Sequence, residues 1–189
     1  MTRVLKSMSQ LPQDQDGAVT SAVIFLHGYG ANGADLMGLT EVLAEHMPGA
    51  LFLAPDAPEM TVIAPMGLQW FPIPWIDGSS EEDAANGLQA ASEDLHAYLD
   101  GVMVDYDLLP EQVVVFGFSQ GTMMALHVAP RREDPVAGVV AFSGRLLQAE
   151  ALQDDVQSKM PILLVHGDED EVVPIDALPH AAETLEAAG

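Results

Sequence analysis

The sequence has no cysteine and very few basic residues. Without cysteine, the chain has no disulfide framework, no thiolate metal site and no cysteine nucleophile. Only 6 Lys and Arg stand against 29 Asp and Glu, which gives a formal net charge of −23. A surface of this charge repels phosphate backbones and anionic membranes, so we do not expect nucleic acid as a partner.

Long apolar runs are also missing. No run reaches the ~18 residues of a membrane span. The first residues, MTRVLKSMSQLPQDQDG, lack the apolar core and the cleavage pattern of a signal peptide. We therefore expect a cytoplasmic protein without a membrane span. Lys6 and Lys159 are the only lysines, which suggests adaptation to high salt as a hypothesis beside that of an ordinary acidic protein.

Apolar residues are plentiful, at 49% of 189 residues, which is enough for the core of one domain. Short runs rich in Val, Ile, Leu and Phe alternate with longer amphipathic stretches, and no linker or repeat divides the chain. Near-continuous apolar runs are typical of strands that are covered on both faces. These predicted strands cover residues 22–26, 51–54, 113–118, 138–142 and 162–165.

Amphipathic stretches between the strands predict helices. This alternation predicts an α/β fold in a single domain over residues 1–189, with a mainly parallel sheet flanked by helices on both faces. Residues 54–78 are the exception, because they are rich in proline and aromatic residues and show no period. A loop of that length is usually functional. The predicted helices cover residues 35–47, 81–104, 120–128, 146–159 and 176–188.

The strongest local motif is Gly117-Phe118-Ser119-Gln120-Gly121, between the strand at 113–118 and the helix at 120–128. A serine at a strained strand-to-helix turn between glycines is exposed above the sheet. The first N–H groups of the following helix can there stabilise an oxyanion. The motif predicts Ser119 as a nucleophile. The alternative is a glycine-rich turn whose serine only caps the helix.

A second glycine-rich segment, His27-Gly28-Tyr29-Gly30, follows the strand at 22–26. In hydrolases with such a serine, the loop after an early strand supplies one oxyanion N–H. The donors here would be the backbone N–H groups of Tyr29 and Gln120. In such hydrolases the catalytic base comes after the serine in the sequence, whereas His27 comes before it. We therefore predict that His27 fixes the loop. A phosphate-binding turn is the alternative, but the acidic residue expected after a second strand is missing.

Four acidic residues, Asp168-Glu169-Asp170-Glu171, follow the last predicted strand. A carboxylate in this place can orient a histidine and stabilise its imidazolium. The residues themselves leave Asp168 and Asp170 as alternatives. The cluster lacks the alternating ligands and the distal glutamate of a calcium loop. We expect no metal and no organic cofactor.

Together these segments resemble the phospholipase/carboxylesterase family, which includes the acyl-protein thioesterases and has the α/β-hydrolase fold. The resemblance runs from about Val23 to the C-terminus, and it includes the segment from His166 to Pro174. It implies that Ser119 is the nucleophile and that Asp170 is the acid. It also implies a serine carboxylesterase that hydrolyses short- to medium-chain acyl esters or thioesters of small molecules.

Three aromatic residues in the segment 54–78 predict an acyl-group pocket, with core packing as the alternative. They are Trp70, Phe71 and Trp75. The Trp-Phe element of the family is present, but Pro72 follows where the thioesterases usually have aspartate. The segment therefore resembles a bacterial carboxylesterase branch, and this argues against palmitoylated proteins as substrates.

The histidines depart from the family pattern. The family base lies a few tens of residues beyond the acid, and His180 is the only histidine after Asp170. Ten residues do not accommodate the intervening helix and strand, so we do not expect His180 to be the base. We expect instead that the last strand and helix of the fold are lacking, together with the catalytic histidine, and that this chain is nearly inactive.

Two other functions remain as alternatives. One is a non-catalytic binding module with the same fold, and the other is a lipase or dienelactone-type hydrolase. An open sheet edge would also allow pairing with a second copy, so a homodimer is a further hypothesis.

Overall fold

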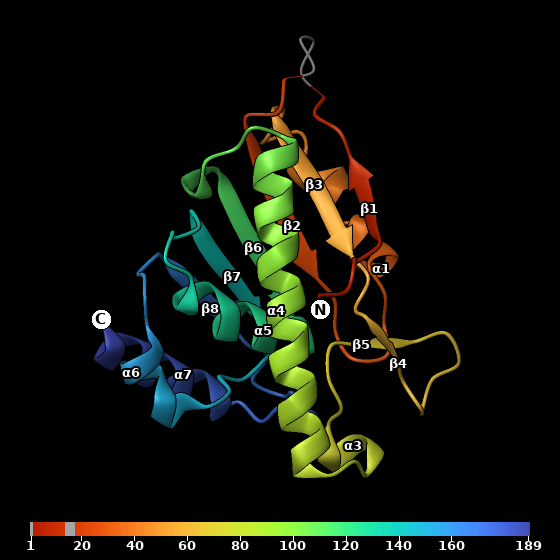
Figure 1. Cartoon of the computed structure of the whole chain (residues 1–189), viewed down its shortest axis with the longest axis vertical. Coiled ribbons are helices and arrows are strands. Elements are labelled where there is room, and N and C mark those ends of the chain that lie inside the picture. Colours follow the sequence, from red (N-terminus) through yellow and green to blue (C-terminus); the bar gives the residue numbers. More distant parts are fainter. Residues whose placement is uncertain (1, 14–17) are drawn as a thin grey trace.

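A computed structural model describes residues 2–13 and 18–189, which form a six-stranded sheet covered by helices (Figure 1). The strand order is β1-β3-β2-β6-β7-β8, and every pairing is parallel except that of β1 with β3. The mainly parallel α/β sheet is therefore confirmed. The strands are β1 (Ser7–Gln10), β2 (Ser21–Leu26), β3 (Ala50–Pro55), β6 (Val113–Phe118), β7 (Gly138–Phe142) and β8 (Ile162–Val165).

All five predicted strands are present. Strands β2 and β3 are buried on both faces, whereas Leu163 of β8 is 56% exposed. The additional strand β1 has the polar sequence Ser-Met-Ser-Gln and is mostly exposed at the sheet edge. It pairs with β3 through backbone groups, and its side chains carry no burial pattern that a sequence argument could use.

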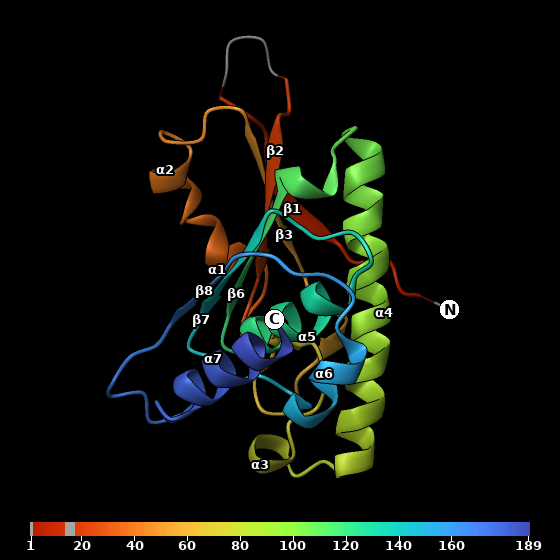
Figure 2. The same cartoon turned by 90° about the vertical axis from the view of Figure 1, so that its left-hand side faces the viewer.

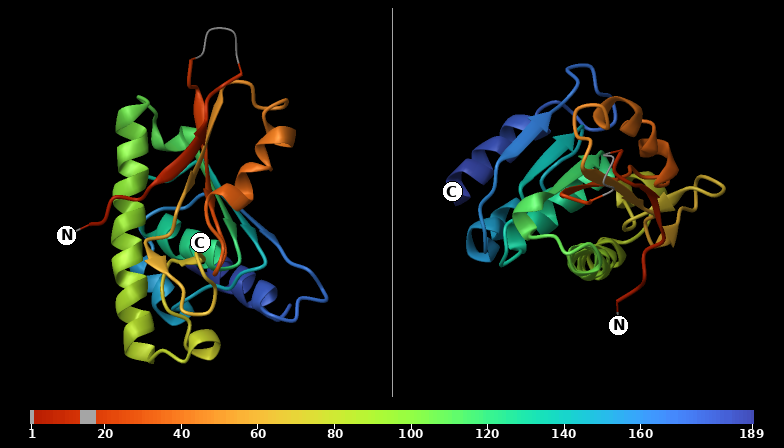
Figure 3. Two further views of the ribbon diagram at one scale, coloured as in Figure 1. Left: turned by 90° about the vertical axis from the view of Figure 1, so that its right-hand side faces the viewer. Right: turned by 90° about the horizontal axis from the view of Figure 1, so that it is seen from above.

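Two helical layers enclose the sheet (Figure 2). One face packs against α4 (Glu81–Asp105), α5 (Gln120–Val128) and α7 (Ala177–Ala188) in the larger core. The other face packs against α1 (Ala34–Met37) and α2 (Thr40–Leu43) in a smaller core around Phe25 and Phe52. The view from above shows the sheet between these two layers (Figure 3). Three 3₁₀ helices connect elements: η1 (Pro110–Gln112), η2 (Ala129–Arg131) and η3 (Ala149–Ala151).

Two predicted helices are wrong in extent. The helix expected at 35–47 is the two short helices α1 and α2, because i→i−3 hydrogen bonds from the N–H groups of Leu39 and Val42 interrupt the α-helical pattern. The helix expected at 146–159 is only η3 and α6 (Leu152–Asp155). Gln148, just before η3, has φ 49°, and Val156, just after α6, has an extended backbone. Neither conformation continues a helix, so the helical segment ends at both points.

The segment 54–78 has local structure that its sequence did not predict. It forms a small hairpin of β4 (Glu59–Met60) and β5 (Leu68–Gln69), then α3 (Pro74–Asp77). Proline at the first position of α3 and left-handed Gly78 after it set the bounds of this single turn. No helix in residues 2–13 and 18–189 is long and apolar enough to cross a membrane.

Two glycines of α4 give a matched test of its packing. A Cβ on Gly101 would meet nothing within 4 Å, whereas a Cβ on Gly87 would lie 2.6 Å from Pro72 Cδ. We expect Gly101→Ala to raise the free energy of unfolding by about 1 kcal/mol, because alanine loses less backbone entropy in a helix. We expect Gly87→Ala to lower it by about 1–3 kcal/mol through overpacking. Urea unfolding followed by circular dichroism measures both, and equal effects of the two variants would contradict this packing.

His127 makes the stability of the fold depend on pH. Its side chain is buried in α5, and burial, followed by the charge of Arg131, lowers the pKa of His127 to about 4. The unfolded chain takes up this proton at about pH 6.5, whereas the folded chain does so only near pH 4. Stability that is present above pH 6.5 is therefore lost as the pH falls toward 4.

We expect the free energy of unfolding to fall less steeply between pH 6.5 and 4.5 in His127→Gln than in the unchanged protein. His46→Gln is the control, because His46 is exposed. Chemical unfolding at a series of pH values gives the slopes. Identical slopes for His127→Gln and the unchanged protein would show that His127 is not buried in its neutral form.

Candidate active site

Two predicted site residues, Ser119 and Asp170, lie just beyond the carboxyl ends of parallel strands, and two residues that were not predicted lie between them. Ser119 follows β6, Ser143 and Gly144 follow β7, and Asp170 follows β8 by a short turn. Because these strands are parallel and adjacent, their carboxyl ends lie side by side at the same end of the sheet. Ligands of open α/β sheets bind at this carboxyl end.

Ser119 occupies a strained turn that only its glycine neighbours permit. Its φ is 53° and its ψ is −112°, which is uncommon for a residue with a Cβ. A Cβ on Gly117 would lie 2.5 Å from the backbone nitrogen of Thr122, and a Cβ on Gly121 would overlap the carbonyl oxygen of Leu26. The Ser119 side chain makes no capping hydrogen bond to α5, so the capping alternative is wrong.

Hydrogen bonds to the neighbouring strand fix this turn. The Ser119 N–H donates to the Phe142 carbonyl at 2.9 Å. The Thr122 hydroxyl lies 2.7 Å from the same carbonyl oxygen and 2.8 Å from that of Gly117. A Cβ on Gly144 would lie 2.8 Å from the Ser119 carbonyl oxygen, so the chain after β7 passes directly against the serine.

Two backbone N–H groups beside Ser119 are candidates for an oxyanion hole. A Cβ on Gly28 would lie 3.3 Å from Ser119 Cβ, which places the loop after β2 against the serine. Within the residues that the structure describes, no acceptor takes the N–H of Tyr29 or Gln120.

The side chain of Tyr29 has a separate partner. Its hydroxyl donates to Asp77 Oδ2 at 3.2 Å, and burial together with the Asp77 charge raises the pKa of Tyr29 to about 12.

His27 fixes the loop after β2, as predicted. Its ring is fully buried, with Nδ1 2.8 Å from the Gly28 carbonyl oxygen and Nε2 2.9 Å from the Ala57 nitrogen. A carbonyl needs a donor and an N–H needs an acceptor, so Nδ1 carries the proton and Nε2 accepts. Burial lowers the pKa of His27, which favours this neutral form. Both ring nitrogens are occupied in joining the two loops.

The two acidic alternatives differ in their surroundings. The N–H groups of Val172 and Val173 each donate to Asp170 Oδ1 at 2.9 Å. These two bonds, that of Val173 first, lower the pKa of Asp170 and so keep it ionised. Asp168 is exposed, whereas the Asp170 side chain is only 18% exposed. The geometry favours Asp170 as the fixed carboxylate.

The three predicted pocket aromatics lie in different environments. Trp70 and Phe71 are buried in the larger core, where Trp70 Nε1 donates to the His27 carbonyl at 3.0 Å. The Gln120 side chain holds this segment, accepting from the Trp70 N–H at 2.9 Å and donating to the Phe71 carbonyl at 2.7 Å. Trp75 is exposed on α3. The structure therefore brings Trp70 and Phe71 together as core residues and leaves only Trp75 open to a ligand.

No histidine side chain forms a hydrogen bond with Ser119 in the described part of the chain. His166 Nε2 is 3.6 Å from Asp170 Oδ2, but this nitrogen also lies 2.7 Å from the Val173 carbonyl oxygen, to which it donates. His180 is exposed on α7. Residues 2–13 and 18–189 also contain no group of three potential ligands around a metal position.

Comparisons with known proteins agree with this geometry. The family model described as Phospholipase/Carboxylesterase matches residues 12–189. Acyl-protein thioesterase 1 of Saccharomyces cerevisiae is 32% identical over 163 residues, covering 81% of this chain and 71% of that protein. Acyl-protein thioesterase 1 of Gibberella zeae is 28% identical over 184 residues, covering 90% of this chain and 78% of that protein.

Solved structures show the same fold. The crystal structure of esterase PE8 superposes with a TM-score of 0.91 at 34% identity, covering 98% of this chain and 85% of that one. Acyl-protein thioesterase 2 of Zea mays has a TM-score of 0.73 at 23% identity, covering 97% of this chain and 85% of that one. The match to the family model over residues 12–189, together with these relatives, shows that the chain belongs to the phospholipase/carboxylesterase family of α/β-hydrolases.

Proposed function

We propose that the protein is a serine carboxylesterase that hydrolyses short- to medium-chain acyl esters or thioesters. The observation that carries this proposal is the strained turn at Ser119, which lies against Gly28. Beside it are the N–H groups of Tyr29 and Gln120, for which the described residues supply no acceptor. The related thioesterases and esterase PE8 support an ester or thioester as the substrate class.

The proposed reaction is acyl transfer to Ser119 and then to water. The Ser119 oxygen attacks the acyl carbon, and its proton passes to an imidazole base. The negative oxygen of the tetrahedral intermediate accepts from the N–H groups of Tyr29 and Gln120. The intermediate expels the alcohol or thiol, which takes the proton from the imidazolium. Water then attacks the acyl-enzyme, and the imidazole takes its proton. The second tetrahedral intermediate releases the acid, and the proton returns to the Ser119 oxygen.

Asp170 would orient the base. Ser119 and Asp170 follow β6 and β8, which are two strands apart, or about 10 Å across the sheet. That separation accommodates one imidazole ring between the serine and the carboxylate. We infer that this ring belongs to none of the six histidines, because none of those in the described residues bonds to Ser119.

Several features complete the proposal. We infer that residues 1–189 act as a single domain in the cytoplasm, on a small-molecule ester and without nucleic acid. Of the three predicted pocket aromatics, we propose only Trp75 as a wall of the substrate site, since Trp70 and Phe71 are core residues.

The sheet also bears on the oligomeric state. Strand β8 pairs only with β7 in the described sheet, so its outer edge supports the hypothesis of a homodimer.

A non-catalytic binding module is the second candidate. The observation that favours it is that no histidine in the described residues forms a hydrogen bond with Ser119. A serine without its base loses most of its catalytic power, because the members of a triad act as a unit. The two candidates make opposite predictions for added imidazole.

Added imidazole tests for an empty base position. We expect the 189-residue chain to hydrolyse p-nitrophenyl butyrate very slowly, and imidazole to raise this rate at least about tenfold because it enters between Ser119 and Asp170. The rate is followed at 400 nm, with the reaction of imidazole itself subtracted. We expect Ser119→Ala to abolish the increase and Ser9→Ala, an exposed residue of β1, to retain it.

The same assay separates the other outcomes. If Ser119→Ala and the unchanged chain respond equally to imidazole, the binding module is supported. Fast Ser119-dependent hydrolysis without imidazole would instead place the base within the chain, and His166→Gln and His180→Gln would then identify it.

Asp170 and Asp168 form a matched pair for the acid. We expect Asp170→Asn to reduce the imidazole-supported rate by about 10²-fold or more, because the imidazolium loses its carboxylate partner. Asp168→Asn removes the same charge from an exposed side chain, and we expect it to change the rate less than about twofold. Rates of initial hydrolysis measure both. A larger loss in Asp168→Asn would assign the acid to that residue.

A further inference from the structure

Among the residues that the structure describes, Arg145 is an arginine without a carboxylate partner. Three other arginines form ion pairs: Arg3 with Glu59 and Asp94, Arg131 with Asp155, and Arg132 with Asp100. Within residues 2–13 and 18–189, Arg145 forms no ion pair and no side-chain hydrogen bond, although the chain has 29 Asp and Glu. Its side chain is exposed, so its N–H donors are available to a ligand.

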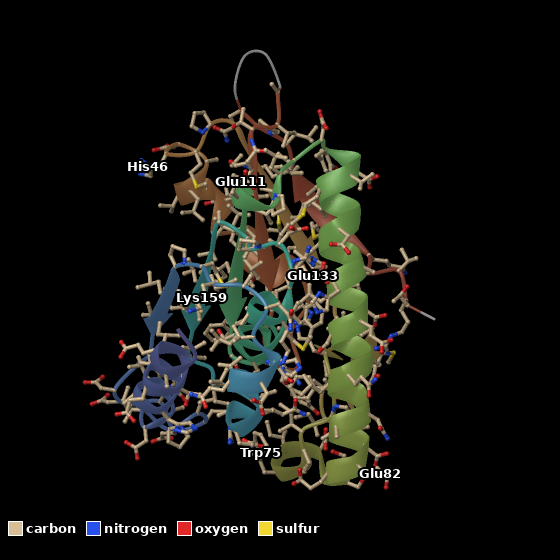
Figure 4. All side chains as sticks on the ribbon, turned by 60° about the vertical axis from the view of Figure 1, so that its left-hand side comes forward. His46, Trp75, Glu82, Glu111, Glu133 and Lys159 are labelled. Carbon is tan, nitrogen blue, oxygen red and sulfur yellow. The ribbon has the colours of Figure 1, made fainter. Side chains whose placement is uncertain are left out.

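Trp75 holds the Arg145 guanidinium in place. The guanidinium carbon lies 5.4 Å from the centroid of the Trp75 ring, within the range of a cation–π contact. Trp75, a residue of α3, is itself 58% exposed, and Figure 4 shows it at the lower end of the molecule. Such a cation–π contact restricts the motion of the guanidinium before a ligand arrives, which reduces the entropy that is lost when the group binds a planar carboxylate.

Both residues are connected to Ser119. Gly144, the residue before Arg145, lies against the Ser119 carbonyl, and Leu146 after it is buried, so the backbone of Arg145 is anchored on both sides. On the other side, Asp77 at the end of α3 accepts from the Tyr29 hydroxyl. Tyr29 follows Gly28, which lies against Ser119. The Arg145–Trp75 contact therefore joins the loop after β7 to α3, whose Asp77 bonds to Tyr29.

We propose that Arg145, in cation–π contact with Trp75, binds a carboxylate of the ester substrate. Arginine presents paired N–H donors that match a carboxylate, and such charge-assisted hydrogen bonds are stronger than neutral ones. The substrate class is an ester with a carboxylate a few bonds from the reacting carbonyl, such as a dicarboxylic acid monoester. The proposal rests on the esterase function, because that function identifies the bound anion as a substrate. The binding itself is measured without catalysis.

The experiment compares two ligands that differ by one methyl group. Monomethyl glutarate carries a carboxylate and dimethyl glutarate is neutral. Calorimetric titration into Ser119→Ala, in which the proposed nucleophile is removed, gives their affinities. Tryptophan fluorescence reports the place of binding, because Trp70, the only other tryptophan, is fully buried. A second anion, 3-acetoxypropanoate, carries its carboxylate on the alcohol side of the ester and shows which side faces Arg145.

Three variants in the Ser119→Ala background test the role of Arg145. We expect Arg145→Gln to weaken binding of the preferred anion at least about tenfold while binding of the diester stays unchanged. Arg145→Lys should retain part of the preference. Lys6→Gln removes the same charge from an exposed residue of the amino-terminal segment, and we expect it to have no effect.

Two outcomes overturn the proposal, and a third separates it from the esterase function. Equal losses in Arg145→Gln and Lys6→Gln would show a response to net charge alone. Anions that bind no more tightly than dimethyl glutarate, or that do not bind, would show that Arg145 is no carboxylate site. A chain that binds the anion through Arg145 but never shows Ser119-dependent hydrolysis would retain this proposal and refute the esterase function.

Discussion

The close contact between the backbone of Gly121 and the end of β2 is the constraint on which the site depends. No side chain fits there, because a Cβ on Gly121 would overlap the carbonyl oxygen of Leu26. The first turn of α5 therefore packs directly on the strand, and Ser119 is forced into its strained conformation just before it. The same approach brings Gly28 and the N–H of Tyr29 to the serine. A bulkier residue would separate the serine from the loop that is proposed to stabilise its oxyanion.

Polar contacts then orient the loops around this close packing. His27 connects the loop after β2 to Ala57, and the Gln120 side chain connects the start of α5 to Trp70 and Phe71. All of these groups are buried, so each would be costly to leave without a partner. The segment 54–78 is thus part of the support of the site. Two of its aromatics serve as core, and the third contributes the exposed face on which Arg145 lies.

Much of this arrangement follows from local sequence patterns. The apolar runs predict the central strands because those strands are buried on both faces, and the glycines around Ser119 predict the turn because only glycine fits there. The structure adds what depends on distant residues. The Gln120 amide, the Asp77–Tyr29 bond and the Arg145–Trp75 contact join segments whose local sequence has no period. The broken helices at 34–43 and 149–155 depend on turn geometry that apolar spacing does not encode. Neither the local sequence patterns nor the contacts between distant residues give the position of the general base, which stays a proposal.

The pairing of β2 with β6 also has a kinetic consequence. These strands are central neighbours in the sheet, yet α1, α2, β3 and the whole of α4 separate them along the chain. A contact of such long range carries a large loop-closure cost and forms slowly in folding. The glycine loop at 27–30 and the turn at 117–121 lie at the ends of these two strands, so they meet only when this pairing is complete. Newly made or partly folded chains therefore carry an ordinary, unstrained serine. The strained turn is therefore a property of the closed sheet alone.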